Sequence, residues 1–166
     1  VQIGVGVHSG ELMLGVVGEA ERMETTVISD AVNVASRLER LTRRYGVGLV
    51  VSEHVMGKLT TRDQYQFRAL DKVQIKGRSE PLVIYEIFAG DPEELVERKL
   101  ATQADYEEAL RLYYDRKFTQ ANLLIAQALA RDPEDQVLHF HQARIAEAVA
   151  RGVPNDWEGV EICNEQ

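Results

Sequence analysis

The sequence of 166 residues has little of several features that would point to particular protein classes. Its only cysteine is Cys163, so no disulfide can form within the chain, and we expect a cytoplasmic protein because low cysteine usage is typical of a reducing compartment. No apolar run approaches the roughly 20 residues that a membrane-spanning helix needs, so the sequence contains no membrane segment. The four histidines are scattered rather than set at the spacing of zinc ligands, and we expect no metal site built on them.

The chain also lacks an excess of basic residues. Its formal net charge is -8; residues 1–90 hold 11 Lys and Arg against 11 Asp and Glu, whereas residues 91–166 hold 8 against 16. Because a phosphate backbone is bound by a concentrated basic surface, we expect no nucleic-acid partner. The acidic second half could instead bind a protein partner.

Residues 25–44, TTVISDAVNVASRLERLTRR, combine polar side chains suited to a functional site with the residue spacing of a helix. An apolar stripe predicts an amphipathic helix that begins at Asp30 or Ala31, with Asp30 as the N-cap, and ends near Tyr45. Gly46 suits a left-handed cap after the helix. Asn33 and Arg37 are four residues apart, so an amide and a guanidinium project from one face of this helix.

The first strands are predicted on both sides of a short turn. Residues 1–8, VQIGVGVH, have apolar side chains at every second position, which is typical of a half-buried strand. The pattern is already under way at Val1, and we therefore expect part of the domain to precede it. Residues 12–17 are predicted to return antiparallel to this strand as a hairpin, and residues 18–24 to form a charged loop.

The remainder of the first half continues this mixture of strands and helices. Strands are predicted at residues 47–52, 65–76 and 82–89, and a short helix capped by Ser52 at residues 53–59. The last two strands form a hairpin around a turn at residues 77–81. This order predicts an α+β fold, with a sheet that carries helices on one face.

Residues 91–166 lack strand patterns. The sequence therefore predicts two domains, an α+β domain of residues 1–90 and an all-α domain of residues 91–166. Helices are expected at residues 93–117, at residues 119–131 with Thr119 as cap, and at residues 133–151. The single tryptophan, Trp157, is expected to pack back on these helices.

The spacing of small residues in this second part matches a helical repeat. A 34-residue tetratricopeptide-like unit that started at Thr102 would place its small residues at Ala109, Ala121 and Ala128 and its proline at Pro133. A plain helical hairpin without repeat ancestry is the alternative. Because such units bury a face against a neighbour, we expect the helices to dock on the sheet or on another copy of the chain.

Three motifs in order resemble the second half of a class III adenylate/guanylate cyclase catalytic domain. They are IGVGVHSGELMLGVVG, TVISDAVNVASRLE, and VQIKGR followed by VIYEI. The resemblance covers residues 1–89 and implies part of a ferredoxin-like cyclase sheet. The helical tail, with NDWEGVEI near its end, looks like the extension of some bacterial, notably cyanobacterial, members.

The resemblance implies roles for four residues in converting ATP to cyclic AMP and pyrophosphate. Asn33 and Arg37 match the VN-x-A-x-R motif, whose asparagine orients the ribose and whose arginine stabilises charge at the phosphate. Lys76 matches the lysine that contacts the triphosphate. Thr26 stands where many members carry a purine-reading aspartate; a subgroup of bacterial adenylate cyclases has threonine there, although a hydroxyl alone does not exclude GTP.

Each of these assignments has a structural alternative. Asn33 could bond locally, Arg37 could form a surface ion pair with Glu39 or Glu24, and Lys76 could be a solvated lysine at a turn.

The resemblance also implies parts that this sequence does not contain. The family uses Mg²⁺ or Mn²⁺ held by two aspartates that lie before the matched region, and none of Asp30, Asp63 and Asp71 has the context to replace them. Family members pair head to tail, so each site takes its aspartates from one subunit and its Asn/Arg pair from the other. We therefore expect a homodimer that binds ATP, and an isolated chain that is inactive. A degenerate cyclase-like regulatory or interaction module is the alternative.

Overall fold

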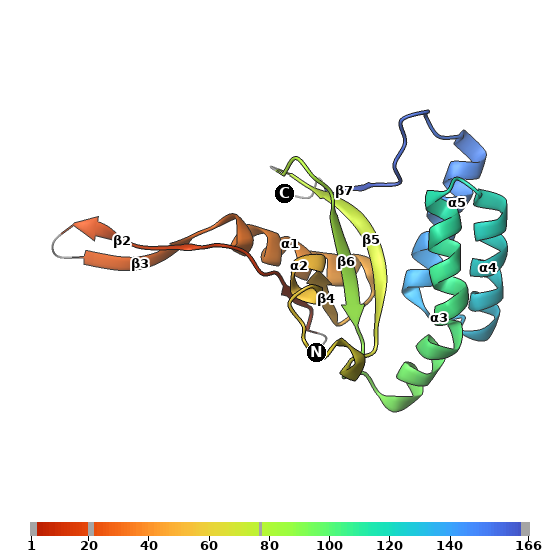
Figure 1. Cartoon of the computed structure of the whole chain (residues 1–166), viewed down its shortest axis with the longest axis horizontal. Coiled ribbons are helices and arrows are strands. Elements are labelled where there is room, and N and C mark those ends of the chain that lie inside the picture. Colours follow the sequence, from red (N-terminus) through yellow and green to blue (C-terminus); the bar gives the residue numbers. More distant parts are fainter. Residues whose placement is uncertain (1–2, 20–21, 77, 164–166) are drawn as a thin grey trace.

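A computed structural model describes residues 3–19, 22–76 and 78–163, and side chains are described outside residues 13–28. Figure 1 shows a curved sheet with α1 and α2 on one side, α3, α4 and α5 on the other, and a long hairpin that projects from the body. In chain order the elements are β1 Val5–Val7, β2 Met13–Glu19, β3 Arg22–Ile28, α1 Asp30–Tyr45, β4 Leu49–Ser52, α2 Glu53–Met56, the 3₁₀ turn η1 Arg62–Gln64, β5 Phe67–Ile75, β6 Leu82–Ile87, α3 Glu93–Tyr114, α4 Phe118–Arg131, α5 Gln136–Arg151 and β7 Glu161–Cys163.

The main sheet has the strand order β1-β4-β6-β5-β7. β1 is parallel to β4, β6 is antiparallel to both β4 and β5, and β7 is parallel to β5. The predicted hairpin of the last two long strands is confirmed, as is the α+β class. No helix in the described part of the chain is both long and apolar enough to cross a membrane.

The predicted hairpin between residues 1–8 and 12–17 is wrong. β1 joins the main sheet, while β2 pairs with β3 in a separate antiparallel ribbon that takes up most of the expected loop at residues 18–24. The reason lies in Gly6 of β1. A Cβ on Gly6 would meet main-chain atoms of Ala35 and Glu39, so this strand face is in close contact with α1. The alternating valines, Val5 and Val7, face away and are 45% and 38% exposed. Residues 1–2, with which the predicted strand began, lie outside the described residues.

The helices of the second half end close to their predicted positions, but their caps differ. α4 begins at Phe118 after Lys117 as N-cap, so Thr119 lies inside the helix. α5 begins at Gln136 rather than in the first turn after Pro133, because the Asp135 side chain accepts a hydrogen bond from the Val137 amide. Trp157 packs on the helices as expected, with its ring centroid 5.0 Å from that of Tyr113.

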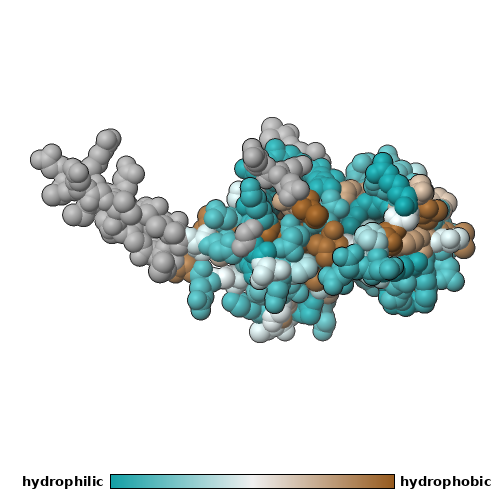
Figure 2. Space-filling model, turned by 90° about the horizontal axis from the view of Figure 1, so that it is seen from above, coloured by the Kyte–Doolittle hydropathy of each residue, from teal (hydrophilic) through white to brown (hydrophobic). Residues whose placement is uncertain are grey.

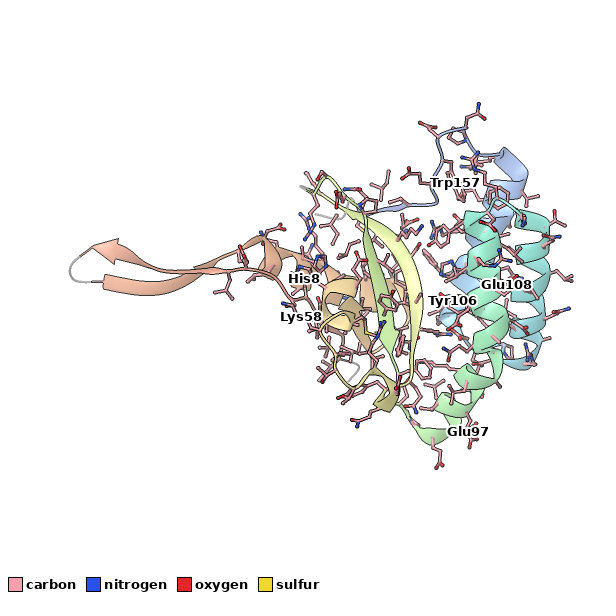
Figure 3. The ribbon with its side chains drawn as sticks, in the orientation of Figure 1. His8, Lys58, Glu97, Tyr106, Glu108 and Trp157 are labelled. Atoms are coloured by element: carbon pink, nitrogen blue, oxygen red, sulfur yellow. The ribbon has the colours of Figure 1, made fainter. Side chains whose placement is uncertain are left out.

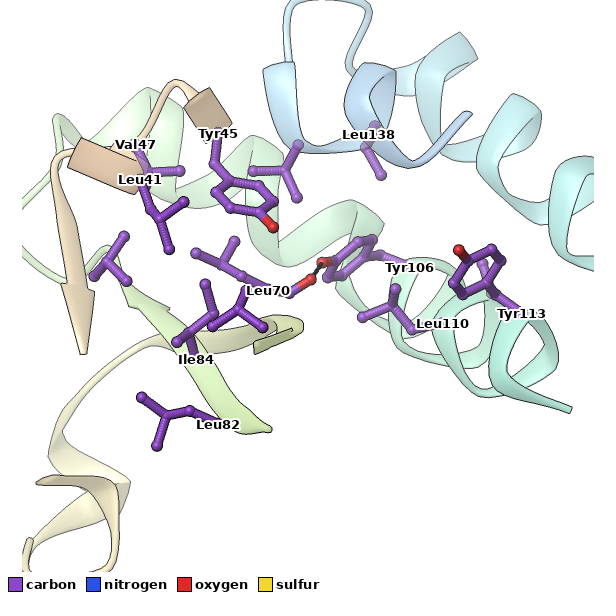
Figure 4. Close-up of a cluster of buried hydrophobic side chains, with 14 of the residues drawn as sticks. Leu41, Tyr45, Val47, Leu70, Leu82, Ile84, Tyr106, Leu110, Tyr113 and Leu138 are labelled. Carbon is purple, nitrogen blue, oxygen red and sulfur yellow. Dashed lines mark hydrogen bonds between the residues drawn. The ribbon is translucent and has the colours of Figure 1, made fainter. Parts of the chain in front are cut away.

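One continuous core joins the sheet to the helices α3–α5. Leu70 and Ile84 of the sheet lie in the same cluster as Tyr106 of α3 and Leu138 of α5, as Figure 4 shows. The Tyr106 hydroxyl donates to the carbonyl oxygens of Ala69 and Leu70. Of the two docking surfaces expected for the helices, the sheet or another copy of the chain, the structure shows the sheet. Most of the surface in Figure 2 is hydrophilic, with small apolar patches.

Candidate functional site

Helix α1 carries the two residues predicted to be catalytic. Val34, Leu38, Leu41 and Tyr45 form its buried side, and Gly46 caps it with a left-handed φ of 67°. Ser29, not the predicted Asp30, is the N-cap, because its side chain accepts a hydrogen bond from the Ala31 amide. Ser29 also donates to the Glu11 carbonyl at 2.7 Å, which ties the start of α1 to the segment before β2.

The structure brings Arg37 and Lys76 together. The Arg37 guanidinium donates through Nη1 to the main-chain carbonyl oxygen of Lys76, directly after the end of β5. Arg37 is half-buried, while the Lys76 side chain is exposed. Among the described residues Arg37 forms no ion pair, and Glu39 bonds Arg43 instead. The remaining N–H groups of Arg37 are thus available to an anion.

Asn33 is exposed one turn before Arg37. Within the described part of the chain no hydrogen bond involves its side chain, so the alternative of local bonding finds no support there. The Thr26 side chain lies outside the described residues; its main chain pairs with Gly15 in the ribbon of β2 and β3. Gly77, which follows Lys76, also lies outside them.

Sequence reasoning missed a group of polar residues at the base of this ribbon. His8 Nδ1 lies 2.8 Å from the buried Ser52 hydroxyl, and the rings of His8 and His54 are 5.1 Å apart. Lys58 donates to Ser9 on the same side of the sheet (Figure 3). Burial first, and then the neighbouring His54, lowers the pKa of His8. The only sequence signal was the shared motif VHSG, because the partners of His8 and Ser9 lie more than 40 residues away.

Arg78 and Asp30 also approach one another near this group. Arg78 Nη1 is 3.5 Å from an Asp30 oxygen, and the Asp30 side chain is 66% exposed. The two residues link the turn after β5 to the start of α1. Such an exposed contact contributes little to stability, and the side chain of Arg78 can turn to another anion.

The second face of the site is formed by β7, which the sequence did not predict. A small surface hollow is lined by Arg37, Arg40, Leu41, Arg44 and Cys163. Three arginines of α1 therefore line one wall and the C-terminal strand lines the other. β7 has only three residues, which is too short for a periodic pattern to reveal it.

The described residues do not form a metal site. No group of three or more His, Cys, Asp and Glu side chains in this part of the chain is arranged to hold an ion. Asp30 lies beside Arg78, Asp71 accepts bonds from Tyr45 and Tyr114, and Asp63 is in the short turn η1.

Comparison with known proteins places the first half of the chain. Residues 1–88 match the family described as "Adenylate and Guanylate cyclase catalytic domain". An adenylate cyclase of Anabaena cylindrica is 42% identical over 90 residues, which is 54% of this chain and 18% of that protein. The terminal-differentiation specific adenylate cyclase of Dictyostelium discoideum is 34% identical over 122 residues, which is 73% of this chain and 6% of that protein.

Among solved structures, a bacterial light-regulated adenylyl cyclase is 28% identical, with a TM-score of 0.46, and the match covers 57% of this chain and 27% of that chain. The chain thus spans less than a fifth of the length of the two relatives described above.

Proposed function

The chain belongs to the family of adenylate and guanylate cyclase catalytic domains, and we propose that it is part of an adenylate cyclase that converts ATP to cyclic AMP and pyrophosphate. In this proposal residues 1–90 are the cyclase part and residues 91–166 a helical extension. The chain contributes residues that contact the ribose and the phosphates. The observation that carries the proposal is the position of Arg37, which is held on the Lys76 carbonyl and forms no ion pair with any described residue.

Cyclisation requires the ribose 3'-oxygen to attack the α-phosphate while pyrophosphate leaves. Negative charge grows on the phosphate oxygens, and a fixed cation stabilises it. Arg37 suits this task because its guanidinium is always charged and is held in place at one nitrogen, while its other nitrogens bond no residue that the structure describes. Asn33, one turn earlier on the same face, can hydrogen-bond the ribose and so orient the attacking oxygen.

Two further residues contact the substrate in this proposal. The exposed ammonium group of Lys76 binds the triphosphate, beside the carbonyl that holds Arg37. Thr26 contacts the purine base in this proposal, because a subgroup of bacterial adenylate cyclases has threonine at this position. ATP is therefore the proposed substrate rather than GTP.

The metal ions, Mg²⁺ or Mn²⁺, would be bound by two aspartates that the family resemblance places before the matched region. In the proposed homodimer one subunit supplies the aspartates and the other supplies Asn33 and Arg37. When bound, the ions activate the attacking oxygen and neutralise the leaving pyrophosphate. Because the described residues hold no cluster of metal ligands, we propose that the purified chain alone forms no cyclic AMP from ATP with either ion.

Complementation tests this function. The partner is an intact class III cyclase catalytic domain in which the arginine of the same motif is replaced by alanine, so that its own dimer is inactive. We expect the wild-type chain to restore cyclic AMP formation, and Arg37→Ala to restore it on the order of 10² to 10³ times less. Arg43→Ala is the matched control on the same helix, because Arg43 forms only an exposed pair with Glu39.

Sedimentation of each mixture verifies that mixed dimers form. Equal restoration by Arg37→Ala and by the wild-type chain would remove Arg37 from the mechanism.

The helical extension supports a second candidate role, as a tetratricopeptide-like module for a protein partner. Ala109, Ala121 and Ala128, the three small positions of the predicted repeat, are all fully buried. However, α3 and α5 already bond the sheet, through Tyr106 and through Arg144 to Asp71. A partner would therefore have to use the outer side, where Leu123 of α4 is 60% exposed. Binding of the proposed kind should be lost in Leu123→Lys without loss of cyclase complementation.

A further inference from the structure

The last part of the chain returns from the helices to the sheet. Trp157 packs between Tyr113 and Phe118, with ring centroids 5.0 and 5.4 Å away, and lies at the end of α3 in Figure 3. The Arg116 guanidinium donates to the carbonyl oxygens of Asn155 and Trp157 at 2.7 and 2.8 Å. The start of this segment is therefore fixed on the helical extension.

From there the chain adds a strand to the sheet beside the candidate site. β7 is parallel to β5, with Glu161 opposite Val73 and Cys163 opposite Ile75. The residue after Ile75 is Lys76, whose carbonyl oxygen holds Arg37. Strand pairing thus fixes β5 up to Ile75, the residue before Lys76.

Glu161 at the start of β7 contacts both α1 and α5. One of its carboxylate oxygens accepts a hydrogen bond from Arg44 at the end of α1, and the other lies 3.4 Å from Arg144 Nε of α5. Arg144 also pairs with the buried Asp71 of β5 and donates to the Gly159 carbonyl at 3.0 Å. One carboxylate therefore joins the helix of Arg37 to the helical extension.

These ionic contacts differ from ordinary surface pairs. The side chains of Glu161 and Arg144 are only 18% and 14% exposed, and that of Arg44 is 31% exposed. Exposed ion pairs contribute little because water screens them and both side chains are mobile. Partly buried groups held by several bonds are restrained, and removal of one of them leaves its partners uncompensated.

The charge of Glu161 also bears on Arg37 itself. Arg37, Arg40 and Arg44 lie on one face of α1 at spacings of three and four residues and line the same hollow. Like charges at these spacings repel one another. Among the described residues, Glu161 is the acid that bonds a member of this series. Its carboxylate thereby offsets one of the three positive charges beside β7.

We propose that Glu161 is a positioning residue of the nucleotide site, through which the C-terminal segment and the helical extension fix α1 and the end of β5 relative to each other. The proposal rests on the proposed function, since it concerns the placement of Arg37. Glu161 touches no substrate in this proposal. It acts through Arg44 and through the pairing of β7 with β5, and it fixes Arg37 opposite the reacting phosphate.

The first test uses hydrogen–deuterium exchange of the whole chain and needs no activity. Glu161→Gln keeps the shape of the side chain and removes its charge. We expect faster exchange in the last turn of α1 and in residues 73–76, by about tenfold. Glu158→Gln is the matched control, because Glu158 is exposed in the same segment and forms no ion pair or side-chain hydrogen bond with any described residue. Unchanged exchange in Glu161→Gln would overturn the proposal.

The second test uses the complementation assay described above. Misplacement of a catalytic group lowers kcat more than it raises KM, and a loss of about tenfold in kcat with less than a twofold change in KM is expected for Glu161→Gln. Arg44→Gln breaks the same contact from the other side and should give the same pattern, which covers the case of a poorly folded Glu161 variant. A kcat within twofold of wild type for both variants would contradict the proposal.

The two proposals fail in different ways. If Arg37→Ala abolishes restoration and both positioning variants retain it, Glu161 has no positioning role and the proposed function stands. If Arg37→Ala retains restoration, the proposed function fails, and the exchange measurement still decides how Glu161 affects α1 and β5.

Discussion

The guanidinium of Arg37 donates a hydrogen bond to the main-chain carbonyl oxygen of Lys76, 39 residues further along the chain. This contact joins α1 to the end of β5 through the main chain. It does not depend on the Lys76 side chain, and the ammonium group is left to bind a ligand. The two residues can therefore be tested separately.

Removal of the Lys76 side chain should weaken binding of ATP and leave Arg37 in place. Lys76→Ala retains the carbonyl oxygen, so we expect KM in the complementation assay to rise roughly tenfold, the effect of one lost charged contact. The value of kcat should change less than in Arg37→Ala. Lys117→Ala is the control, because Lys117 is an exposed lysine of the helical extension. An unchanged KM would show that Lys76 is a solvated turn residue.

Local signals allowed α1 to be predicted from the sequence almost to the residue. Its apolar stripe and the glycine after it are all within 17 residues. Only the cap was misplaced by one residue, because Ser29 and Asp30 are both good N-caps and the sequence does not choose between them.

Features that depend on distant partners were not predictable. Gly4, just before β1, and Gly6 within it give the same alternation as a half-buried strand, although they mark the close approach of α1. β7 becomes a strand only because β5 offers it an edge. The motifs predict Asn33, Arg37 and Lys76 as site residues, whereas the contact of Arg37 with the Lys76 carbonyl uses a main-chain atom that no motif encodes.

The buried Arg68 should be essential to the stability of the chain. It is 1% exposed and bonds Glu86 through Nε at 2.6 Å and Asp135 through both terminal nitrogens at 2.5 and 3.1 Å. Arg68→Ala leaves two buried carboxylates without this partner, and we expect the free energy of unfolding to fall by about 3–5 kcal/mol. Urea denaturation measures this change.

The control for Arg68 is Arg111→Ala. Arg111 is 55% exposed and pairs with Glu108 and Asp115 on the surface of α3, so its loss should cost less than about 0.5 kcal/mol. A loss in Arg68→Ala as small as that in Arg111→Ala would show that the buried network does not stabilise the joint between sheet and helices.

His141 should make stability depend on pH. Its ring is buried, and Nε2 lies 2.9 Å from the Leu70 carbonyl oxygen. Burial first, and then the charge of Arg144, lowers its pKa from 6.5 to about 3; the Leu70 carbonyl and Asp135 oppose this shift, and Arg68 adds to it.

The sign of the dependence follows from this lowered pKa. Below pH 6.5 the unfolded chain binds a proton at His141 that the folded chain does not bind until about pH 3. The contribution of His141 is therefore complete above pH 6.5 and is lost as the pH falls, by at most about 1.4 kcal/mol per pH unit. Urea denaturation between pH 7 and pH 4.5 should show a shallower decline for His141→Gln than for wild type. His139→Gln, on the exposed side of α5, is the control and should follow the wild type. Identical slopes for wild type and His141→Gln would contradict the buried neutral imidazole.

The exposed side of β1 should cause the chain to associate. β1 is the last strand of the sheet, so within the described residues its second edge has no partner strand. Ile3 beside it is 74% exposed and Val5 within it 45% exposed. An unpaired edge with exposed apolar side chains pairs readily with a second chain, and a charged residue on such an edge prevents it. We therefore expect the wild-type chain to sediment as a dimer or larger species at micromolar concentration, and Val5→Lys to shift it toward monomer. Leu123→Lys is the control, because it removes an apolar side chain that is even more exposed, 60% against 45% for Val5, from α4, far from this edge. A monodisperse wild-type monomer would rule out association through β1, and a shift in Leu123→Lys rather than Val5→Lys would place the contact on the helical extension.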